Sequence, residues 1–360
     1  MRVAVVGCGY WGSKHVRVLT SLEEVSGVAI VDPDPERRSR LQSAFSTVAA
    51  YAELEAALPH IDAVIVATPP ALHTAVAVAA LEAGKDVLVE KPLTTSLAEG
   101  RSLVELAERL DRVLMVGHTF EYNAAVRELR HRIRMGELGA LRYLDSAWLN
   151  LGLYQNDVNV IWDLAPHAIS ISNFLLDSVP SRVSVWGSAH AARSFEDVAQ
   201  LRLDYEHADV TAYVRVSWLD PAKVRRVTVV GSERMAVYND LSSTERLRIF
   251  DRGVDPVDTS LGLHQMPLNY RYGDIVSPHI PFAEPLAVED SHFLECVINR
   301  KLPLTNGFSG TAVVAVLEAA SEALRTGRAV DIAGMDLEAP TDNSKDALPS
   351  SVLTPWSAAS

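Results

Sequence analysis

The hydrophobic positions of the first 122 residues form short continuous runs, separated by stretches in which apolar residues recur every three or four positions. Such runs are typical of strands buried on both faces, and the intervening period is typical of helices with one buried face. Their regular alternation predicts an α/β domain built on a doubly wound parallel sheet of about six strands. The runs that carry this prediction are Val3–Val6, Val28–Val31, Ala63–Thr68, Val87–Val89 and Val113–Gly117.

The pattern changes after Asn123, where apolar and polar residues alternate with a period of two over several short segments. This alternation predicts a mainly antiparallel sheet with one covered face, and therefore a second, α+β domain. Two late helices, at 287–299 and 309–326, are expected to pack back on the first domain. We predict domains at 1–122 and 123–332. The remainder, 333–360, is rich in Ser, Pro, Asp and Ala without periodicity, which predicts a disordered tail.

The turn after the first strand carries three glycines in the spacing G-x-G-x-x-G, at Gly7, Gly9 and Gly12. The first allows a tight turn, the second lets the backbone approach a pyrophosphate, and the third lets the next helix pack on the strand. The phosphates would meet the free N–H groups at the start of that helix. We therefore expect this turn, with Tyr10 and Trp11, to bind a dinucleotide; a parallel sheet without a ligand is the alternative.

The second strand ends in Asp32, 20 residues after Gly12. A carboxylate there can accept hydrogen bonds from both hydroxyls of an adenosine ribose, which is the arrangement that binds NAD. Arg37, in the helix expected at 34–45, could instead meet the 2′-phosphate of NADP, or could be a solvated helix residue. Because Asp32 would repel a phosphate, NAD is favoured over NADP.

The ends of the third and fourth strands supply further candidates for the crevice where doubly wound sheets bind ligands. Thr68, Pro69 and His73 are expected at the edge of the cofactor, although a lone histidine is more often a surface or capping residue. Glu90 and Lys91 follow a buried strand, where charge is costly unless it is solvated or paired in a site. Lys91 could lie beside the nicotinamide; a structural Glu–Lys pair is the alternative. The segment His118–Asn123 would lie on the same rim.

A second pair of candidates lies in the other predicted domain, at the start of an apolar helix. Asp163 and His167 are four residues apart and therefore share one helix face. A carboxylate and an imidazole so placed can act as orienter and acid–base group. The alternative is that Asp163 is simply the N-cap of this helix, beside an ordinary histidine.

Composition limits the classes of partner. The 360 residues are 48% hydrophobic and carry a formal net charge of −13, which argues against nucleic acid or an anionic membrane as a partner. The two cysteines, Cys8 and Cys296, exclude a disulfide framework and a zinc spacing, and no metal is expected. The first strand starts at Arg2, which leaves no room for a signal peptide. No apolar run is expected to reach the roughly 18 residues that cross a bilayer. We therefore predict a cytoplasmic protein.

Taken together, these residues resemble the Gfo/Idh/MocA family of dehydrogenases over approximately residues 1 to 332. The resemblance rests on G-C-G-Y-W-G, Asp32, the A-T-P-P segment, V-E-K-P at 89–92 and D-x-x-x-H at 163–167. It implies an N-terminal NAD(P)-binding Rossmann domain. It also implies a C-terminal domain with an open-faced, mainly antiparallel sheet, through which members form homodimers or homotetramers.

The family resemblance also implies roles for individual residues. His167 would take the proton from a ring hydroxyl while hydride leaves the same carbon for the nicotinamide. Lys91 would stabilise the developing alkoxide, and Asp163 would hold the substrate or the histidine. Glu90 and Trp162 are counted with the cofactor-binding residues.

The wording around Asp163 is similar to members that act on nucleotide-activated amino sugars, and the segment Tyr270–Asp274 also fits that subgroup. Arg271 and its neighbouring tyrosines could meet a diphosphate or uracil, or could be a plain polar loop. The preferred function is therefore oxidation at C3 of a nucleotide sugar, or reduction of a 3-keto sugar. An inositol or free-sugar dehydrogenase stays open. So does a non-catalytic NAD(P)-sensing regulator, although such a protein should lose the catalytic lysine or histidine.

Overall fold

The computed structural model describes residues 1–152, 154–155, 158–191, 195–255 and 269–332. Their contacts divide them into two compact units. Unit 1 comprises residues 1–123 and 281–318, and unit 2 comprises residues 124–280 and 319–332 where they are described. The chain leaves unit 1 after residue 123 and enters it again at residue 281, so the described part of unit 1 is built from two separate segments. The tail predicted at 333–360 lies outside the described residues, as do Asn156 and Asp157 of the segment before Asp163.

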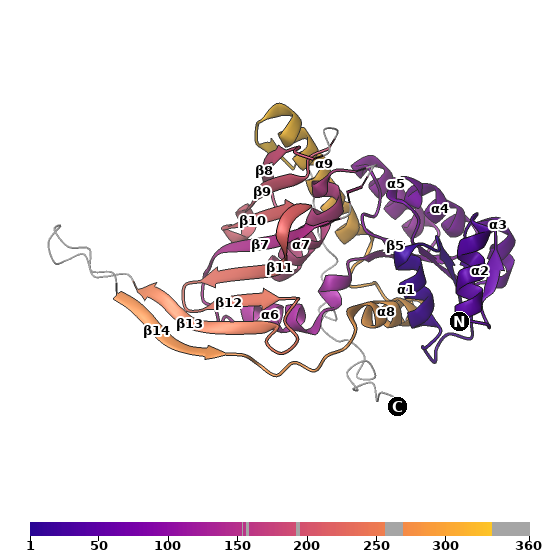
Figure 1. Ribbon diagram of the computed structural model, residues 1–360, viewed down its shortest axis with the longest axis horizontal. Helices are drawn as coiled ribbons and strands as arrows, with labels where there is room; N and C mark the ends of the chain where they lie inside the picture. Colours follow the sequence, from indigo (N-terminus) through magenta and orange to yellow (C-terminus); the bar gives the residue numbers. More distant parts are fainter. Residues whose placement is uncertain (153, 156–157, 192–194, 256–268, 333–360) are drawn as a thin grey trace. The chain divides into compact units, whose positions relative to one another are not determined.

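Unit 1 contains a parallel sheet in the strand order β3-β2-β1-β4-β5-β6 (Figure 1). This is the order of a doubly wound dinucleotide-binding fold, in which the strand order reverses between the first and fourth strands. Five of the strands were predicted, whereas the edge strand β3 was missed because its three residues give no period to read. The strands are β1 (Arg2–Val6), β2 (Gly27–Val31), β3 (Ala49–Tyr51), β4 (Ala63–Val66), β5 (Asp86–Glu90) and β6 (Leu114–Gly117).

Helices cover both faces of this sheet, because its strands are apolar on both sides and the side chains of β1, β4 and β5 are almost entirely buried. Late helix α8 packs on α1 and on the short 3₁₀ turn Thr119–Tyr122, so this part of the chain returns to the first sheet as predicted. The helices are α1 (Tyr10–Leu19), α2 (Pro35–Ala44), α3 (Leu54–Ala57), α4 (Pro70–Glu82), α5 (Leu97–Arg109) and α8 (Pro285–Asn299).

Unit 2 is organised on a second sheet, in which the described strands follow the order β14-β13-β12-β11-β7-β10-β9-β8-β15 (Figure 1). The pairing is antiparallel except between β10 and β7, which run parallel. The predicted mainly antiparallel sheet is therefore confirmed. Its strands are β7 (Leu141–Leu151), β8 (Arg182–Ser188), β9 (Val198–Tyr205), β10 (Val210–Ser217), β11 (Leu219–Gly231), β12 (Met235–Asn239), β13 (Leu247–Asp255), β14 (Asn269–Val276) and β15 (Val330–Asp331).

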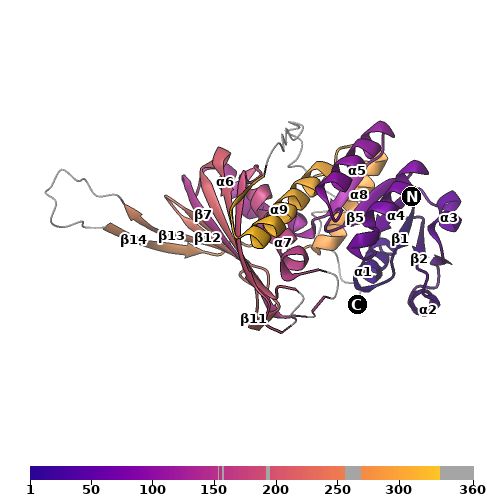
Figure 2. The ribbon, with the colours of Figure 1, turned by 90° about the horizontal axis from the view of Figure 1, so that it is seen from above.

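One face of this second sheet is covered by helices. Helix α7 (Val160–Leu176) packs on β7, β9 and β10, and α6 (Ala124–Arg134) packs on α7 and β12 (Figure 2). The strands alternate accordingly: Leu201 and Leu203 of β9 are buried, whereas Arg202 between them is exposed. On the uncovered side, the rings of Tyr143 and Tyr213 lie 6.4 Å apart across β7 and β10, and both are partly exposed.

Helix α9 (Gly307–Thr326) corrects one expectation. Among the described residues it is long and apolar enough, by length and composition, to cross a membrane, whereas the sequence was expected to contain no such stretch. Its two glutamates, Glu318 and Glu322, interrupt the apolar run when the sequence is read residue by residue. In the folded chain, 61% of the qualifying window is buried inside the protein.

Candidate functional site

The glycine turn between β1 and α1 leaves no space for side chains at two of its three glycines. Gly7 has φ of +94°, a conformation that favours glycine, and a Cβ there would lie 2.5 Å from the carbonyl oxygen of Ala67. A Cβ on Gly12 would lie 1.8 Å from the carbonyl oxygen of Gly7. These glycines therefore bring the start of α1 directly against the turn that follows β1.

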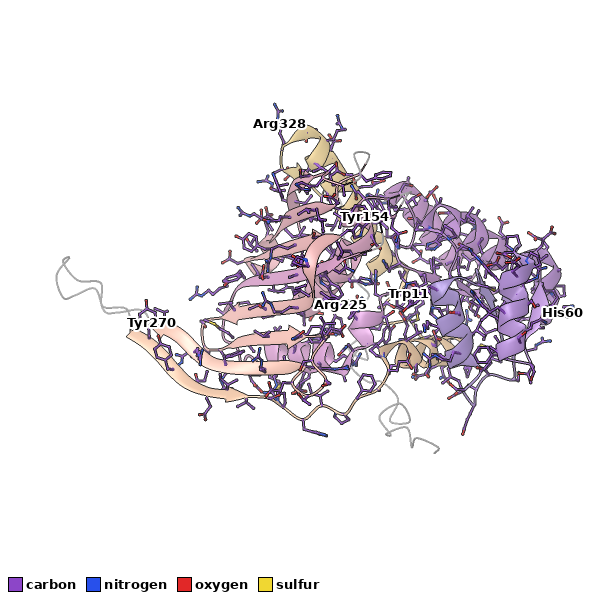
Figure 3. The ribbon with its side chains drawn as sticks, in the orientation of Figure 1. Trp11, His60, Tyr154, Arg225, Tyr270 and Arg328 are labelled. Carbon is purple, nitrogen blue, oxygen red and sulfur yellow. The ribbon has the colours of Figure 1, made fainter. Side chains whose placement is uncertain are left out.

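The middle glycine faces open space instead. A Cβ added to Gly9 would have no atom within 4 Å. Gly9 is also the N-cap of α1, where its carbonyl accepts the hydrogen bond of Ser13 N at 3.1 Å. The N–H groups of the first helical turn have no partner within the helix and can bind an anion in that space. Tyr10 and Trp11 are the first two residues of α1 and their side chains are exposed; Trp11 is labelled in Figure 3.

Asp32 lies at the end of β2 and is almost fully buried. One carboxylate oxygen accepts the N–H of Cys8 at 2.7 Å, and the other accepts the N–H of Asp34 at 2.9 Å. These bonds tie the carboxylate to the glycine turn and fix its orientation, while each oxygen keeps a lone pair for a ribose hydroxyl. Arg37 Nη1 lies 3.7 Å from the same carboxylate and the arginine is half-exposed.

The loop after β4 and the loop after β5 are joined by His73. Its ring nitrogens lie 2.8 Å from the carbonyl oxygen of Pro92 and 2.9 Å from that of Thr68. Burial lowers the pKa of His73, so the ring is neutral and donates one of these bonds. His73 itself is inside the protein and holds the two loops together. Thr68 Oγ1 is buried and has no hydrogen-bond partner among the described residues, whereas Pro69 is exposed.

Glu90 and Lys91 lie at the end of β5, with Glu90 turned into a buried polar cluster. One Glu90 oxygen accepts the backbone N–H of Lys91 at 3.2 Å. The other lies 3.1 Å from His15 Nε2, and His15 Nδ1 lies 2.8 Å from Asp290 Oδ1. His15 belongs to α1 and Asp290 to α8. This cluster therefore links the helix behind the glycine turn to the strand end that carries Lys91.

The pKa shifts in this cluster favour the charged forms of His15 and Glu90, and the neutral forms of Glu289 and Asp290. Burial opposes protonation of His15, but the two carboxylates outweigh it and place the pKa of His15 well above its usual value. Burial likewise opposes ionisation of Glu90, yet the hydrogen bond and charge of His15 hold the pKa of Glu90 below its usual value. For Asp290 and its neighbour Glu289, burial dominates and raises the pKa of each carboxyl group. We infer an imidazolium–carboxylate pair between His15 and Glu90.

Unit 2 places Asp163 and His167 in the first two turns of α7. Asn159 caps this helix by accepting the N–H groups of Ile161 and Trp162, each at 3.2 Å. The interpretation of Asp163 as the N-cap is therefore wrong, because the helix begins at Val160, three residues earlier than Asp163. Asp163 lies in the first turn of the helix and does not cap it.

Two tryptophans contact the pair, Trp148 on β7 and Trp218 in the bend between β10 and β11. Trp218 is buried and donates its indole N–H to Asp163 Oδ2 at 2.8 Å. The ring of Trp148, on β7, lies 5.2 Å from that of His167 at an angle of 32°. Both Asp163 and His167 remain half-buried. Trp162 is bonded differently, because its indole donates to Ser321 Oγ at 2.9 Å.

These observations test whether the residues present fit a bound dinucleotide. The structure brings together the glycine turn, the ordered Asp32 carboxylate, the buried hydroxyl of Thr68 and the segment of Glu90 and Lys91, all in unit 1. Open space at Gly9 beside the start of a helix suits a pyrophosphate, and Asp32 suits a ribose without a 2′-phosphate. The residues of unit 1 therefore fit NAD.

The segment at 270–274 gives less support to a diphosphate site. Tyr270 and Tyr272 lie on β14 with their rings 6.3 Å apart, and both are exposed. Arg271 donates to Asp251 Oδ1 at 3.0 Å and contacts the carbonyl of Glu233. Acidic residues are in the majority around this arginine, which does not favour an anion. A cavity of about 470 Å³ at this place is lined by three acidic residues and two arginines, namely Glu137, Glu233, Asp251, Arg234 and Arg271.

Comparison with protein families gives a match to each unit. Residues 1–118 match the model of an oxidoreductase family with an NAD-binding Rossmann fold, and residues 126–237 match the GFO/IDH/MocA C-terminal domain. The chain belongs to the Gfo/Idh/MocA family of oxidoreductases. The predicted fold class, cofactor NAD and enzyme class are thereby confirmed.

Individual relatives agree over most of their length. UDP-N-acetylglucosamine 3-dehydrogenase of Acidithiobacillus ferrooxidans is 28% identical over 316 residues, which cover 88% of this chain and 94% of the relative. D-apiose dehydrogenase of Paraburkholderia graminis is 25% identical over 354 residues, 94% of this chain and 91% of the relative. The crystal structure of GenD2 from gentamicin A biosynthesis, in complex with NAD, superimposes with a TM-score of 0.78 at 24% identity, covering 92% and 96% of the two chains. This Gfo/Idh/MocA protein is thus an NAD-dependent oxidoreductase of the sugar and polyol dehydrogenase class.

Four residues that contact the predicted site residues of this Gfo/Idh/MocA protein, directly or through His15, could not be named from the sequence. They are the partners of predicted residues, namely His15, Asp290, Trp148 and Trp218. His15 offered a weak signal, since it lies on the first turns of α1, one turn beyond Gly12. The tryptophans and Asp290 gave none, because they meet the site only through tertiary contacts.

Proposed function

We propose that this protein is an NAD-dependent 3-dehydrogenase of a nucleotide-activated amino sugar, or catalyses the reverse reduction of a 3-keto sugar. The observation that carries this proposal is the likeness to UDP-N-acetylglucosamine 3-dehydrogenase over 94% of that relative. The retained Lys91, Asp163 and His167 support an enzyme over a non-catalytic regulator, since a protein that only senses NAD does not require an acid–base pair.

In this proposal Lys91, Asp163 and His167 each have a separate role in the oxidation of one secondary hydroxyl. His167 accepts the hydroxyl proton, and Lys91 stabilises the negative charge that develops on the oxygen. NAD, when bound, supplies the nicotinamide C4 that accepts the hydride. Asp163 is oriented by the indole N–H of Trp218 at 2.8 Å and holds the substrate hydroxyls or the imidazole. The side chains of Asp163 and His167 each contact a buried tryptophan, Trp218 and Trp148 respectively, which favours a fixed geometry.

Two further properties belong to the proposal. We infer a homodimer or homotetramer that covers the open face of the second sheet, because that face exposes Tyr143, Tyr213 and Trp186. Light scattering would show the assembly, and Tyr213→Glu should shift it toward the monomer. We also propose a cytoplasmic location, since Cys8 and Cys296 are both free thiols in the described chain; fractionation of cells would test it.

The test is NADH formation by the purified protein. Four substrates are compared, each in the presence of saturating NAD: UDP-N-acetylglucosamine, its uronate, myo-inositol and glucose. Lys91→Met removes the proposed oxyanion contact and should reduce kcat by roughly 10²-fold or more. Lys301→Met is the matched control, because Lys301 pairs with Glu295 on the exposed surface, and should keep wild-type activity.

Each outcome has a defined meaning. Turnover confined to the nucleotide sugars, and lost in Lys91→Met, supports the proposal. Turnover of inositol or glucose instead would replace the substrate class while keeping the mechanism; the likeness to D-apiose dehydrogenase makes a free sugar the second candidate. Binding of NAD without turnover of any sugar in either direction would favour the regulator.

A further inference from the structure

His118 follows directly after β6, at the edge of the sheet where Lys91 follows β5. The parallel register of these strands pairs Glu90 with Gly117, so His118 and Lys91 are the next residues on neighbouring strands. The backbone of His118 is fixed by its own short turn, in which Glu121 N donates to its carbonyl at 2.9 Å. The side chain is only 1% exposed. It is thus a buried imidazole beside the candidate catalytic lysine.

Neither ring nitrogen of His118 has a hydrogen-bond partner among the described residues. The other buried histidines of unit 1 differ from it in this respect. Each ring nitrogen of His15 contacts one carboxylate, and each ring nitrogen of His73 contacts one backbone carbonyl oxygen. A buried polar group without a partner destabilises a protein, so such groups call for an explanation, often a functional one.

The protonation state limits what this ring can bind. Burial lowers the pKa of His118 to about 4; the charge of Glu90 opposes this shift and that of Lys91 adds to it. The imidazole is therefore neutral at physiological pH and offers one N–H donor and one acceptor nitrogen. A neutral group beside Lys91 can contact an uncharged ligand without competing with the lysine for an anion.

We propose that His118 is a ligand-binding residue of this active site. Its two ring nitrogens bind a group that is both donor and acceptor, either a hydroxyl of the sugar or the carboxamide of the nicotinamide. The inference rests on the proposed function for the location of substrate and cofactor at this edge, but it assigns a residue that the family motifs of this chain do not include.

The substitution His118→Phe distinguishes a purely structural histidine from one that binds a ligand. His118→Phe fills a similar volume and removes both unpartnered nitrogens. If the ring only fills space, the variant should bind its ligands normally. If the ring binds a ligand, the variant should keep or raise the melting temperature of the ligand-free protein while losing affinity, as is usual where function and stability compete.

The experiment measures three quantities in wild type, His118→Phe and His118→Asn, which retains a donor and an acceptor. They are the melting temperature without ligand, the Kd of NAD, and kcat/KM for the sugar of the test panel that is turned over. His73→Phe is the matched control, since its two contacts to carbonyl oxygens are lost and its melting temperature should fall.

We expect His118→Phe to melt at or above the wild-type temperature and to lose roughly tenfold or more in one binding step, with His118→Asn closer to wild type. A weaker Kd for NAD identifies the carboxamide, whereas an unchanged Kd with a raised KM identifies a sugar hydroxyl. Unchanged Kd and kcat/KM, or a fall in melting temperature like that of His73→Phe, would overturn the proposal. If no sugar is turned over, the proposed function fails, and the Kd of NAD then decides the role of His118 alone.

Discussion

Replacing His15 by asparagine removes a buried cation that contacts the carboxyl groups of Glu90 and Asp290. The ring lies 3.1 Å from a Glu90 oxygen and 2.8 Å from an Asp290 oxygen, and it has no exposed surface. Asparagine keeps a hydrogen-bond donor in the site but no positive charge. The variant therefore tests whether the charge of His15, rather than its hydrogen bonds alone, stabilises the end of β5.

The expected loss of unfolding free energy at neutral pH is about 3 kcal/mol. Breaking a buried ion pair by removing one partner typically costs about 3–5 kcal/mol, because an uncompensated charge stays behind. We place this cluster at the low end of that range. The pKa of Asp290 is already raised by burial, so this carboxyl group can take up a proton in the variant and relieve part of the penalty.

The pH dependence gives the prediction its sign. Because the pKa of His15 is raised above 6.5, its contribution is complete below pH 6.5 and is lost as the pH rises through the folded-state pKa. Because the pKa of Glu90 is lowered from 4.5, its contribution is complete above pH 4.5 and is lost as the pH falls through the folded-state pKa. The difference in unfolding free energy between wild type and variant should therefore be largest between pH 4.5 and pH 6.5, and should shrink under alkaline conditions.

Urea unfolding at a series of pH values measures this difference. His73→Asn is the control with the opposite slope, because the pKa of His73 is lowered by burial, so the stabilising effect of its neutral form grows as the pH rises toward 6.5. A His15→Asn variant that loses the same free energy at every pH, or less than about 1 kcal/mol throughout, would refute the imidazolium–carboxylate pair, since that is the size of a neutral hydrogen bond.

Further predictions follow from other contacts of the site. Gly12→Ala should destabilise the protein by more than about 3 kcal/mol in urea unfolding, since its Cβ would lie 1.8 Å from a backbone oxygen, whereas Gly9→Ala should unfold normally and weaken NAD roughly tenfold by titration. Asp32→Asn should raise the ratio of kcat/KM for NADP over NAD by about tenfold, because the charge that repels a 2′-phosphate is removed; an unchanged ratio contradicts this role. Trp218→Phe should lower kcat/KM roughly fivefold by releasing Asp163, and Asp163→Asn in the same background should add little.

The first sheet was predictable because its information is local. Continuous apolar runs, the glycine spacing and Asp32 each depend on residues within about one supersecondary unit. The same holds for the alternation that predicted the second sheet. The parallel pairing of β7 with β10 was not predictable in this way, because β8 and β9 intervene in the chain while β7 pairs with β11 on its other side.

The candidate residues were named from the sequence, but their partners were not. His15 and Asp290 are 275 positions apart, and Trp218 is 55 positions from Asp163. No periodicity connects residues at such separations, so the contacts exist only once the sheets have formed. The helix cap was misjudged for a local reason, since Asn159 and Asp163 are both good capping residues and the sequence does not say which one precedes the first turn.

The most direct measurement of the central claim follows the hydride itself. UDP-N-acetylglucosamine carrying deuterium at C3 is incubated with NAD and the enzyme, and the reduced cofactor is analysed by mass spectrometry. We predict deuterium in the NADH formed by wild type, much slower NADH formation by Lys91→Met, and an unchanged rate for the Lys301→Met control. NADH that forms without deuterium, or at the same rate in the Lys91 variant, would contradict hydride transfer from C3 assisted by Lys91.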